Sequence, residues 1–264
     1  MDLGLKGKIA VVTGSTAGIG FAIASTLAAE GAEVIINGRT QQRVDAALDK
    51  VRKLSPNAKL RGVAADLSSA SGVQSFTKEA AEADILVNNV GIFEPKPFAE
   101  IPDADWQRFF DLNVMSGVRL SRHYLPGMQR KNWGRIIFIS SESGQQIPAE
   151  MIHYGMTKTA QIAVARGLAE SLAGTGITVN SVLVGPTESE GVGTFVNDLA
   201  RQQGISKSEF EKKFFESVRP SSLLKRFETP AEVAAVVAFV AGTQSVTING
   251  AAVRADGGVV RSIL

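Results

Sequence analysis

The feature that most constrains the fold is a glycine-rich turn near the N-terminus, which joins an apolar run to an apolar helix. The run Ile9–Val12 is short and flanked by polar and glycine residues, which is typical of a fully buried strand. The turn has the spacing G-x-x-x-G-x-G at Gly14, Gly18 and Gly20, and the helix follows over 21–29. Glycine lets the backbone approach a ligand closely, and a helix N-terminus offers unpaired N–H groups. The pattern therefore predicts a phosphate-binding turn, the alternative being a plain strand–helix turn.

Apolar runs of strand length alternate with helix-like segments along the rest of the chain. Further strands are predicted at 33–37, 59–64, 84–88, 135–140, 178–184 and 251–254, and helices at 40–53, 69–81, 103–130, 154–172 and 229–241. Such alternation predicts an α/β fold, with one doubly wound parallel sheet of about seven strands and helices on both faces. No internal repeat or linker interrupts the pattern, so residues 1–264 are predicted to form a single domain.

Composition excludes several classes of function. The 264 residues carry a net charge of +2 with no long charged block, so neither nucleic acid nor an anionic membrane is an expected partner. There is no cysteine and only two histidines, which excludes thiolate catalysis and argues against a metal site. We find no signal peptide and no uninterrupted apolar run of roughly 18 residues. The expected location is therefore cytoplasmic, as a soluble protein.

Tyr154 and Lys158 are four residues apart inside an apolar run, which places phenol and ammonium on one face of a helix. A free tyrosine keeps its proton until a pH of about 10, and a fixed cation nearby favours the phenolate. A tyrosine tuned in this way can donate a proton to a carbonyl oxygen or accept one from an alcohol. The spacing alone is a weak signal, because such pairs are common on helices.

The end of the second predicted strand carries Gly38 and Arg39. In a βαβ dinucleotide-binding fold this position meets the adenosine ribose, where an acidic residue would bind the 2′-hydroxyl. A guanidinium at Arg39 suits a 2′-phosphate instead, through charge-assisted hydrogen bonds. The alternative is a solvated arginine at a strand end. Polar and glycine residues also follow the other predicted strands at the carboxyl edge, where ligands of such sheets bind.

In combination these motifs resemble the short-chain dehydrogenase/reductase family. The resemblance runs from Lys8 to Gly258 and rests on TGSTAGIG at 13–20, NNVG at 88–91 and the motif residues Asn113, Ser141, Tyr154 and Lys158. Ser141 lies 13 residues before Tyr154 and 28 residues after Asn113, as in that family. The resemblance implies a Rossmann-type fold and an NAD(P)-dependent enzyme that transfers hydride between a nicotinamide cofactor and a small-molecule carbonyl or alcohol.

The resemblance also implies residue roles. Tyr154 would be the general acid–base, Lys158 would lower its pKa and hold the nicotinamide ribose, and Ser141 would bind the substrate oxygen. Asn113 would support a water that relays protons to Lys158. The implied cofactor-binding residues are Gly14, Ser15, Thr16, Gly18, Ile19, Gly20, Arg39, Asp66, Leu67, Asn89, Val90, Gly91, Tyr154, Lys158, Gly185, Thr187 and Ser189.

Two departures from the family pattern bear on these roles. The loop after strand six usually reads Pro-Gly-x-x-x-Thr, whereas Val184 replaces its proline and Ser189 replaces its threonine, which leaves Thr187 and Ser189 as alternatives for binding the carboxamide. Ala17 lacks the basic side chain that often precedes the second glycine in NADP-preferring members. Only Arg39 then favours NADP over NAD, and NADP is the cofactor we expect.

The expected activity is that of a ketone reductase or secondary-alcohol dehydrogenase, including 3-oxoacyl thioester, steroid and sugar substrates. A non-catalytic dinucleotide-binding regulator and an epimerase or dehydratase using the same tyrosine are the alternatives. Asp256-Gly-Gly258 and the long helices resemble the family's subunit contacts, which implies a homotetramer or a homodimer.

Further candidates lie in the loops. Glu94, Gln145, Gln146 and Met151 follow strand ends and are candidates for lining the substrate cavity, while His153 is expected to have a wall or surface role. The charged, aromatic segment near 190–226, which includes Phe195, is predicted to form a small helical lid, with a fixed surface helix pair or a subunit contact as alternatives.

Overall fold

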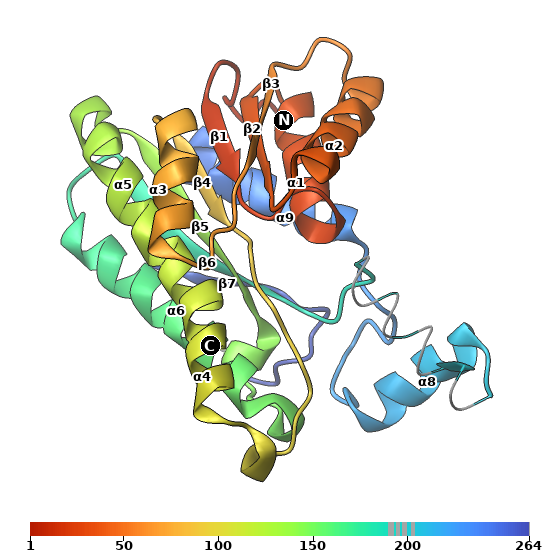
Figure 1. The fold of residues 1–264 in the computed structure, drawn as a ribbon. Coiled ribbons are helices and arrows are strands. Elements are labelled where there is room, and N and C mark those ends of the chain that lie inside the picture. The colour runs from red at the N-terminus through yellow and green to blue at the C-terminus, as the bar shows by residue number, and fades with distance from the viewer. Residues whose placement is uncertain (190–192, 194–195, 197–199, 202–203, 264) are drawn as a thin grey trace.

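A seven-stranded parallel sheet forms the centre of the protein in the computed structural model (Figure 1), which describes residues 1–189, 193, 196, 200–201 and 204–263. The strand order is β3-β2-β1-β4-β5-β6-β7, and every pairing is parallel. The strands are β1 Ile9–Val12, β2 Glu33–Gly38, β3 Leu60–Ala64, β4 Ile85–Asn88, β5 Gly134–Ser141, β6 Ile177–Val184 and β7 Ala252–Ala255. The predicted doubly wound α/β architecture is confirmed.

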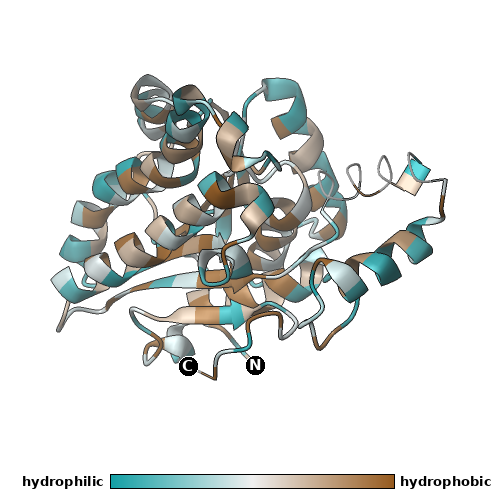
Figure 2. Cartoon of the chain, turned by 90° about the horizontal axis from the view of Figure 1, so that it is seen from below, coloured by the Kyte–Doolittle hydropathy of each residue, from teal (hydrophilic) through white to brown (hydrophobic). Residues whose placement is uncertain are grey.

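Helices cover both faces of the sheet (Figure 1). Helices α1 (Gly18–Ala29), α2 (Gln41–Leu54) and α9 (Pro230–Ala241) bury their apolar residues in one core layer. Helices α3 (Ala70–Glu79), α5 (Ser116–Lys131) and α6 (Ile152–Ser171) form the other. Figure 2 shows the apolar positions concentrated where helices and sheet meet. Because β1, β4 and β5 contribute to both layers, each contains an unbroken apolar run, namely 9–12, 85–87 and 136–139, as expected for strands buried on both sides.

Side-chain caps fix several helix starts. Thr40 and Ser69 cap α2 and α3 by accepting hydrogen bonds from backbone N–H groups three residues further on. Helix α9 begins with a reciprocal capping box between Thr229 and Glu232, with Pro230 in its first turn. No described helix is both long and apolar enough to cross a bilayer.

The predicted helix over 103–130 is interrupted, which corrects the prediction. Helix α4 (Asp103–Phe110) runs into a π-helical turn, η2 (Asp111–Met115), before α5 begins. The turn places Asn113 in the interior, with 1% of its surface exposed. π-turns inside helices are frequent at functional sites, and this one adjoins the cavity described below.

The segment after β6 contains α8 (Lys207–Ser217), within the range where a small helical lid was predicted. Within that range, residues 190–192, 194–195 (including Phe195), 197–199 and 202–203 lie outside the described residues. An apolar cluster joins α8 to the chain before and after it, formed by Val196, Ala200, Phe210, Phe215 and Phe227. Short 3-10 turns η1 (Phe98–Glu100), η3 (Glu142–Gly144), η4 (Ala149–Met151) and η5 (Thr243–Ser245) complete the described elements.

Candidate active site

A cavity of about 530 Å³ lies where the carboxyl ends of β4, β5 and β6 meet the segment around α8. Residues from α1, from the loop after β4, from the end of β5, from α6 and from the loop after β6 line it. This is the edge of the sheet at which ligands of doubly wound folds bind, since the loops diverge there. The cavity therefore gathers side chains from segments far apart in the sequence.

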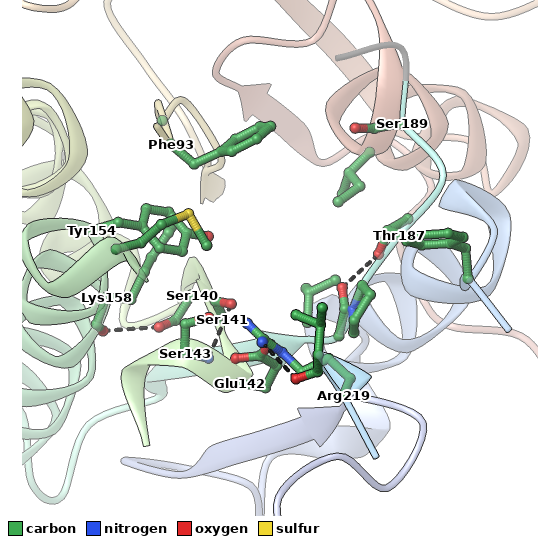
Figure 3. A pocket seen from close by; sticks show the side chains of 18 of the residues that line it. Phe93, Ser140, Ser141, Glu142, Ser143, Tyr154, Lys158, Thr187, Ser189 and Arg219 are labelled. Carbon is green, nitrogen blue, oxygen red and sulfur yellow. Dashed lines mark hydrogen bonds and ion pairs between the residues drawn. The ribbon is translucent and has the colours of Figure 1, made fainter. Parts of the chain in front are cut away.

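Ser141, Tyr154 and Lys158 all line this cavity (Figure 3). Ser141 is the last residue of β5, and its hydroxyl oxygen accepts a hydrogen bond from the Ser143 N–H at 3.1 Å. Tyr154 and Lys158 lie one turn apart on α6, with Lys158 Nζ 5.6 Å from the centroid of the Tyr154 ring. The spacing of four residues thus brings the phenol and the ammonium to one side of the helix, as the sequence indicated.

Burial dominates the electrostatics of this pair. It raises the pKa of Tyr154 to about 12, an effect that a hydrogen bond with Ser141 partly offsets. Burial lowers the pKa of Lys158 to about 8. The direction for Tyr154 is opposite to the sequence-based expectation, because desolvation penalises the phenolate. Tyr154 accordingly holds its proton at neutral pH and can serve as a hydrogen-bond donor in the cavity.

Gln161 links the side chain of Lys158 to the backbone of Asn113. Asn113 accepts a hydrogen bond from the Ile92 N–H at 2.8 Å and donates from Nδ2 to the Ile92 carbonyl and to Thr157 Oγ1, both at 3.0 Å. Gln161 donates to the Asn113 carbonyl at 2.6 Å and accepts from Lys158 Nζ at 3.3 Å. The sequence analysis missed Gln161, although its position three residues after Lys158 on the same helix face was a usable signal.

The glycine turn fits a phosphate group. Helix α1 begins at Gly18 with no side-chain cap and no acidic residue in its first turn, so its first N–H groups have no side-chain acceptor. Gly14 and Gly18 adopt φ values of 59° and 57°, which favour glycine. A Cβ on Gly20 would lie 2.5 Å from both Asn89 Nδ2 and the Gly14 carbonyl oxygen, so the helix approaches the turn too closely for any side chain.

Two of the other predicted cofactor residues near this turn have structural contacts. Ser15 is fully buried and links two strands, donating to the Val12 carbonyl at 2.6 Å and accepting from the Asn37 N–H at 3.0 Å. Thr16 packs against Gly38, where a Cβ would lie 2.4 Å from Thr16 Cγ2. Ile19, in contrast, reaches the cavity.

Two of the residues that are predicted to meet the adenosine part of the cofactor are exposed. Arg39 is exposed directly after β2, and Asp66 is exposed after β3, accepting a hydrogen bond from the Ser68 N–H at 3.0 Å. Leu67 beside it is buried. The remaining predicted members of this side follow β4. Asn89 donates from Nδ2 to the Thr13 and Gly14 carbonyls, the Val90 N–H donates to Thr13 Oγ1, and Gly91 lines the cavity.

The loop after β6 contributes Gly185, Thr187 and Ser189 to the cavity lining. Val184 ends β6 in regular register with Ala255, so its replacement of the family proline leaves the strand intact. Thr187 Oγ1 donates to the Gly185 carbonyl at 2.9 Å, and the Ser189 N–H bonds the Thr187 carbonyl. This compact turn presents both candidate hydroxyl residues to the same cavity.

A buried ion pair in the cavity wall was not predicted. Arg219, from the segment after α8, donates from Nε to Glu142 Oε1 at 2.7 Å, and the two residues are 8% and 3% exposed. Arg219 Nη1 lies 3.4 Å from Glu150 Oε1. Because Glu142 and Arg219 are 77 positions apart, no spacing pattern in the sequence could connect them.

Of the four loop residues that were candidates for lining the substrate cavity, one does so. Met151 lines the cavity, whereas Glu94, Gln145 and Gln146 are absent from its described lining, and Glu94 pairs with Arg108 at 2.8 Å instead.

His153 is fully buried beside Phe109, with ring centroids 4.1 Å apart, and burial lowers its pKa. It also contacts Trp106 edge-on. His153 is therefore packed between α6 and the aromatic rings of α4, consistent with a wall role rather than an acid–base role.

Comparison with known proteins places this geometry in context. The sequence profile described as short chain dehydrogenase matches residues 8–199. The chain is 48% identical to the oxidoreductase YvaG of Bacillus subtilis, covering 100% of both chains. It is 33% identical to the D-beta-hydroxybutyrate dehydrogenase of Cupriavidus necator, covering 97% of this chain and 99% of the relative. The crystal structure of L-sorbose reductase from Gluconobacter frateurii, complexed with NADPH and L-sorbose, superposes with a TM-score of 0.94 at 30% identity, covering 100% of both chains.

The matched profile covers the glycine turn and both residues of the Tyr154–Lys158 pair, and the sheet order is that of the superposed reductase fold. The chain therefore belongs to the short-chain dehydrogenase/reductase family and is an NAD(P)-dependent oxidoreductase that acts on CH–OH groups.

Proposed function

We propose that the protein is an NADP-dependent ketone reductase or secondary-alcohol dehydrogenase. The observation that carries this proposal is the convergence of Ser141, Tyr154 and Lys158 on one cavity, whose opposite side is formed by Ile19 from α1 and by the loop after β6. In this role NADPH, when bound, supplies the hydride that reaches the carbonyl carbon. The chain's own residues manage the charge that develops on the carbonyl oxygen.

Tyr154 is the proton donor of the reduction. Its pKa of about 12 keeps the phenol protonated at neutral pH, so that it can hydrogen-bond the carbonyl oxygen and then transfer its proton. Ser141 assists, because its oxygen accepts a bond from the Ser143 N–H, and its hydroxyl proton, which bonds Tyr154 in the resting site, can turn to the same carbonyl oxygen. Two donors aimed at one developing oxyanion stabilise the transition state.

Lys158 binds the nicotinamide ribose and restores the proton of Tyr154. Two of its three donor positions are used by the Ile139 carbonyl, at 2.8 Å, and by Gln161, at 3.3 Å, which leaves one for a ligand hydroxyl. The Asn113 carbonyl is held by Gln161 Nε2. Gln161 thus joins the two groups between which the family resemblance implied a relaying water, and its amide fixes the position of Lys158.

Two observations support NADP over NAD. Arg39 lies at the end of β2, where its guanidinium is free to approach a 2′-phosphate. An acidic side chain at position 38, which would bind a 2′-hydroxyl, would bring its Cβ within 2.4 Å of Thr16 Cγ2. The related L-sorbose reductase was crystallised with NADPH.

The test is a substrate screen that follows nicotinamide absorbance with NADPH and NADH side by side, using a panel of ketones and secondary alcohols. Replacing the acid–base hydroxyl in Tyr154→Phe should abolish turnover while cofactor binding persists. Turnover that survives this change would remove Tyr154 from the mechanism. Saturable cofactor binding without turnover of any carbonyl would favour a regulatory role, and turnover without net change in the cofactor would indicate an epimerase or dehydratase.

A homotetramer or homodimer assembled through the Asp256–Gly258 region and the long helices stays a prediction, as does a cytoplasmic location. Sedimentation would test the assembly, and a monomer would reject it.

A further inference from the structure

The charged residues of the cavity wall are few and unevenly balanced. Among the described lining residues they are Glu142, Glu150, Lys158 and Arg219. Lys158 lies beside Tyr154 and is engaged by Ile139 and Gln161. Away from it, two carboxylates face a single guanidinium, which leaves this part of the wall with one net negative charge.

Arg219 is occupied by these carboxylates. Its Nε bonds Glu142 Oε1 at 2.7 Å, and its Nη1 bonds the Val218 carbonyl at 3.1 Å and lies 3.4 Å from Glu150 Oε1. Figure 3 shows the Glu142 and Arg219 side chains pointing toward each other near Ser141. Separating such a buried pair leaves an uncompensated charge. A ligand anion that took Arg219 away from Glu142 would therefore leave the Glu142 carboxylate buried and unpaired, at a large cost in free energy.

Glu142 itself opposes an anion in the cavity. Its Oε2 is buried and has no hydrogen-bond partner in the described part of the chain, so its charge is only partly compensated by Arg219. Two like charges a few ångströms apart repel each other more strongly in a poorly solvated cavity than in water, because the effective dielectric constant is lower there. A carboxylate beside Glu142 would meet that repulsion, because Arg219 is already held by Glu142 and Glu150, and the ammonium of Lys158 bonds Ile139 and Gln161.

The rest of the wall is apolar. Phe93 stands edge-on to Tyr154, with ring centroids 6.4 Å apart, on one side of the cavity. Phe210, Phe214 and Phe227 line it on the side of α8, and the ring centroids of Phe214 and Phe227 lie 5.1 Å apart. Burying apolar ligand surface against such rings is favourable at roughly 25 cal/mol per Å².

We propose that this cavity selects neutral carbonyl compounds that carry an apolar substituent and rejects those that carry a carboxylate, with Glu142 as the residue that enforces the choice. The inference rests on the proposed function, since it assigns a substrate class to the same site. It also separates this protein from its relative named for D-beta-hydroxybutyrate, whose substrate is an anion at neutral pH.

The test uses a matched pair of ligands, benzoylacetate and its methyl ester, which share the ketone and the phenyl ring and differ in charge. Their affinities are measured by calorimetry on the complex with NADP⁺, in which a ketone cannot be reduced. We expect the ester to bind at least about tenfold more tightly than the acid. In Glu142→Gln, which frees Arg219, we expect the acid to gain affinity and the ratio to fall to about threefold or less.

Glu170→Gln is the matched control, because Glu170 pairs with Arg166 on the exposed surface of α6, outside the cavity lining. It should leave the ratio unchanged. Equal binding of the two ligands, or binding of neither, to the wild-type protein overturns the inference. If a folded Glu142→Gln variant keeps the wild-type ratio of ester to acid affinity, Glu142 is not the cause of the selectivity. If that variant fails to fold, Glu150→Gln must lower the same ratio for the inference to stand.

Kinetics separate this inference from the proposed function. If the ester binds selectively but is not reduced by NADPH, and no other neutral ketone is, the ketone-reductase function proposed above fails while the selectivity of the cavity stands. If neutral ketones are reduced but benzoylacetate is reduced as efficiently as its ester, the proposed function stands and the selectivity fails.

Discussion

Glu228→Gln should make the protein markedly more stable at alkaline pH. Glu228 is 6% exposed and its backbone pairs with the loop after β6, the N–H bonding the Pro186 carbonyl and the carbonyl receiving the Glu188 N–H. Burial raises the pKa of its carboxyl to about 7, with a further rise from the negative charge of Asp256 and a partial offset from hydrogen bonds with Gly185 and Thr187. Its Oε2 lacks a partner among the described residues.

The sign follows from proton linkage. The pKa is raised from 4.5 in the unfolded chain to about 7 in the folded one, so the folded state binds the proton more tightly. The stabilisation is complete below pH 4.5 and is lost as the pH rises toward 7. At about 1.4 kcal/mol per pKa unit, the loss between about pH 5 and about pH 8 amounts to about 2–3 kcal/mol, and glutamine, which does not ionise, escapes it.

The assay is urea unfolding of wild type and Glu228→Gln at both pH values, with the free energy of unfolding extrapolated to water. The advantage of the variant in free energy of unfolding should grow by about 2–3 kcal/mol from the lower to the higher pH. Glu170→Gln, on the exposed face of α6, should show no such growth. A difference in free energy of unfolding between Glu228→Gln and wild type that stays constant with pH would refute the assigned pKa shift and its cause, the burial of this carboxyl.

Three further outcomes follow from the site. Gly20→Ala should weaken dinucleotide binding by about tenfold or more in a fluorescence titration, because its Cβ would lie 2.5 Å from Asn89 Nδ2 and deform the phosphate turn; unaltered affinity would contradict the phosphate assignment. Arg39→Ser should lower the ratio of kcat/KM for NADPH over NADH by about tenfold, and an unchanged ratio would assign 2′-phosphate recognition elsewhere. Gln161→Leu should reduce kcat by about tenfold with little change in KM for the ketone, since it loosens Lys158; a change in KM alone would contradict a positioning role.

The architecture was predictable because its signals are local. Each strand is a short apolar run, and a parallel sheet with both faces covered demands such runs. The right-handed connection of successive strands then places every strand end on one edge. Ser141 at the end of β5 and the glycines after β1 had to reach that edge, and a spacing of four residues on α6 had to bring Tyr154 and Lys158 together.

Asn113 marks where this local information ends. A polar residue in the middle of a predicted helix indicated that something was unusual, since asparagine is a poor helix former. The sequence did not show that the helix passes through a π turn, or that the Asn113 amide bonds both the Ile92 backbone and Thr157. Those partners lie on other elements, so they exist only once the tertiary structure has formed. The same holds for the burial that raises the pKa of Tyr154.

The substrate selectivity proposed above depends on residues of this second kind. The groups proposed to act on the reacting oxygen lie on a strand and a helix, where periodicity fixes their direction, whereas the groups that would discriminate between substrates come from turns and from the segment around α8. A charged residue in a sequence is expected to be exposed, and only packing reveals that Glu142 and Arg219 are buried together. Because a buried charge acts strongly through a medium of low dielectric constant, two such residues can change selectivity without touching the catalytic residues. Members of one family can therefore share Tyr154, Lys158 and Ser141 and still differ in substrate through a single pair in the cavity wall.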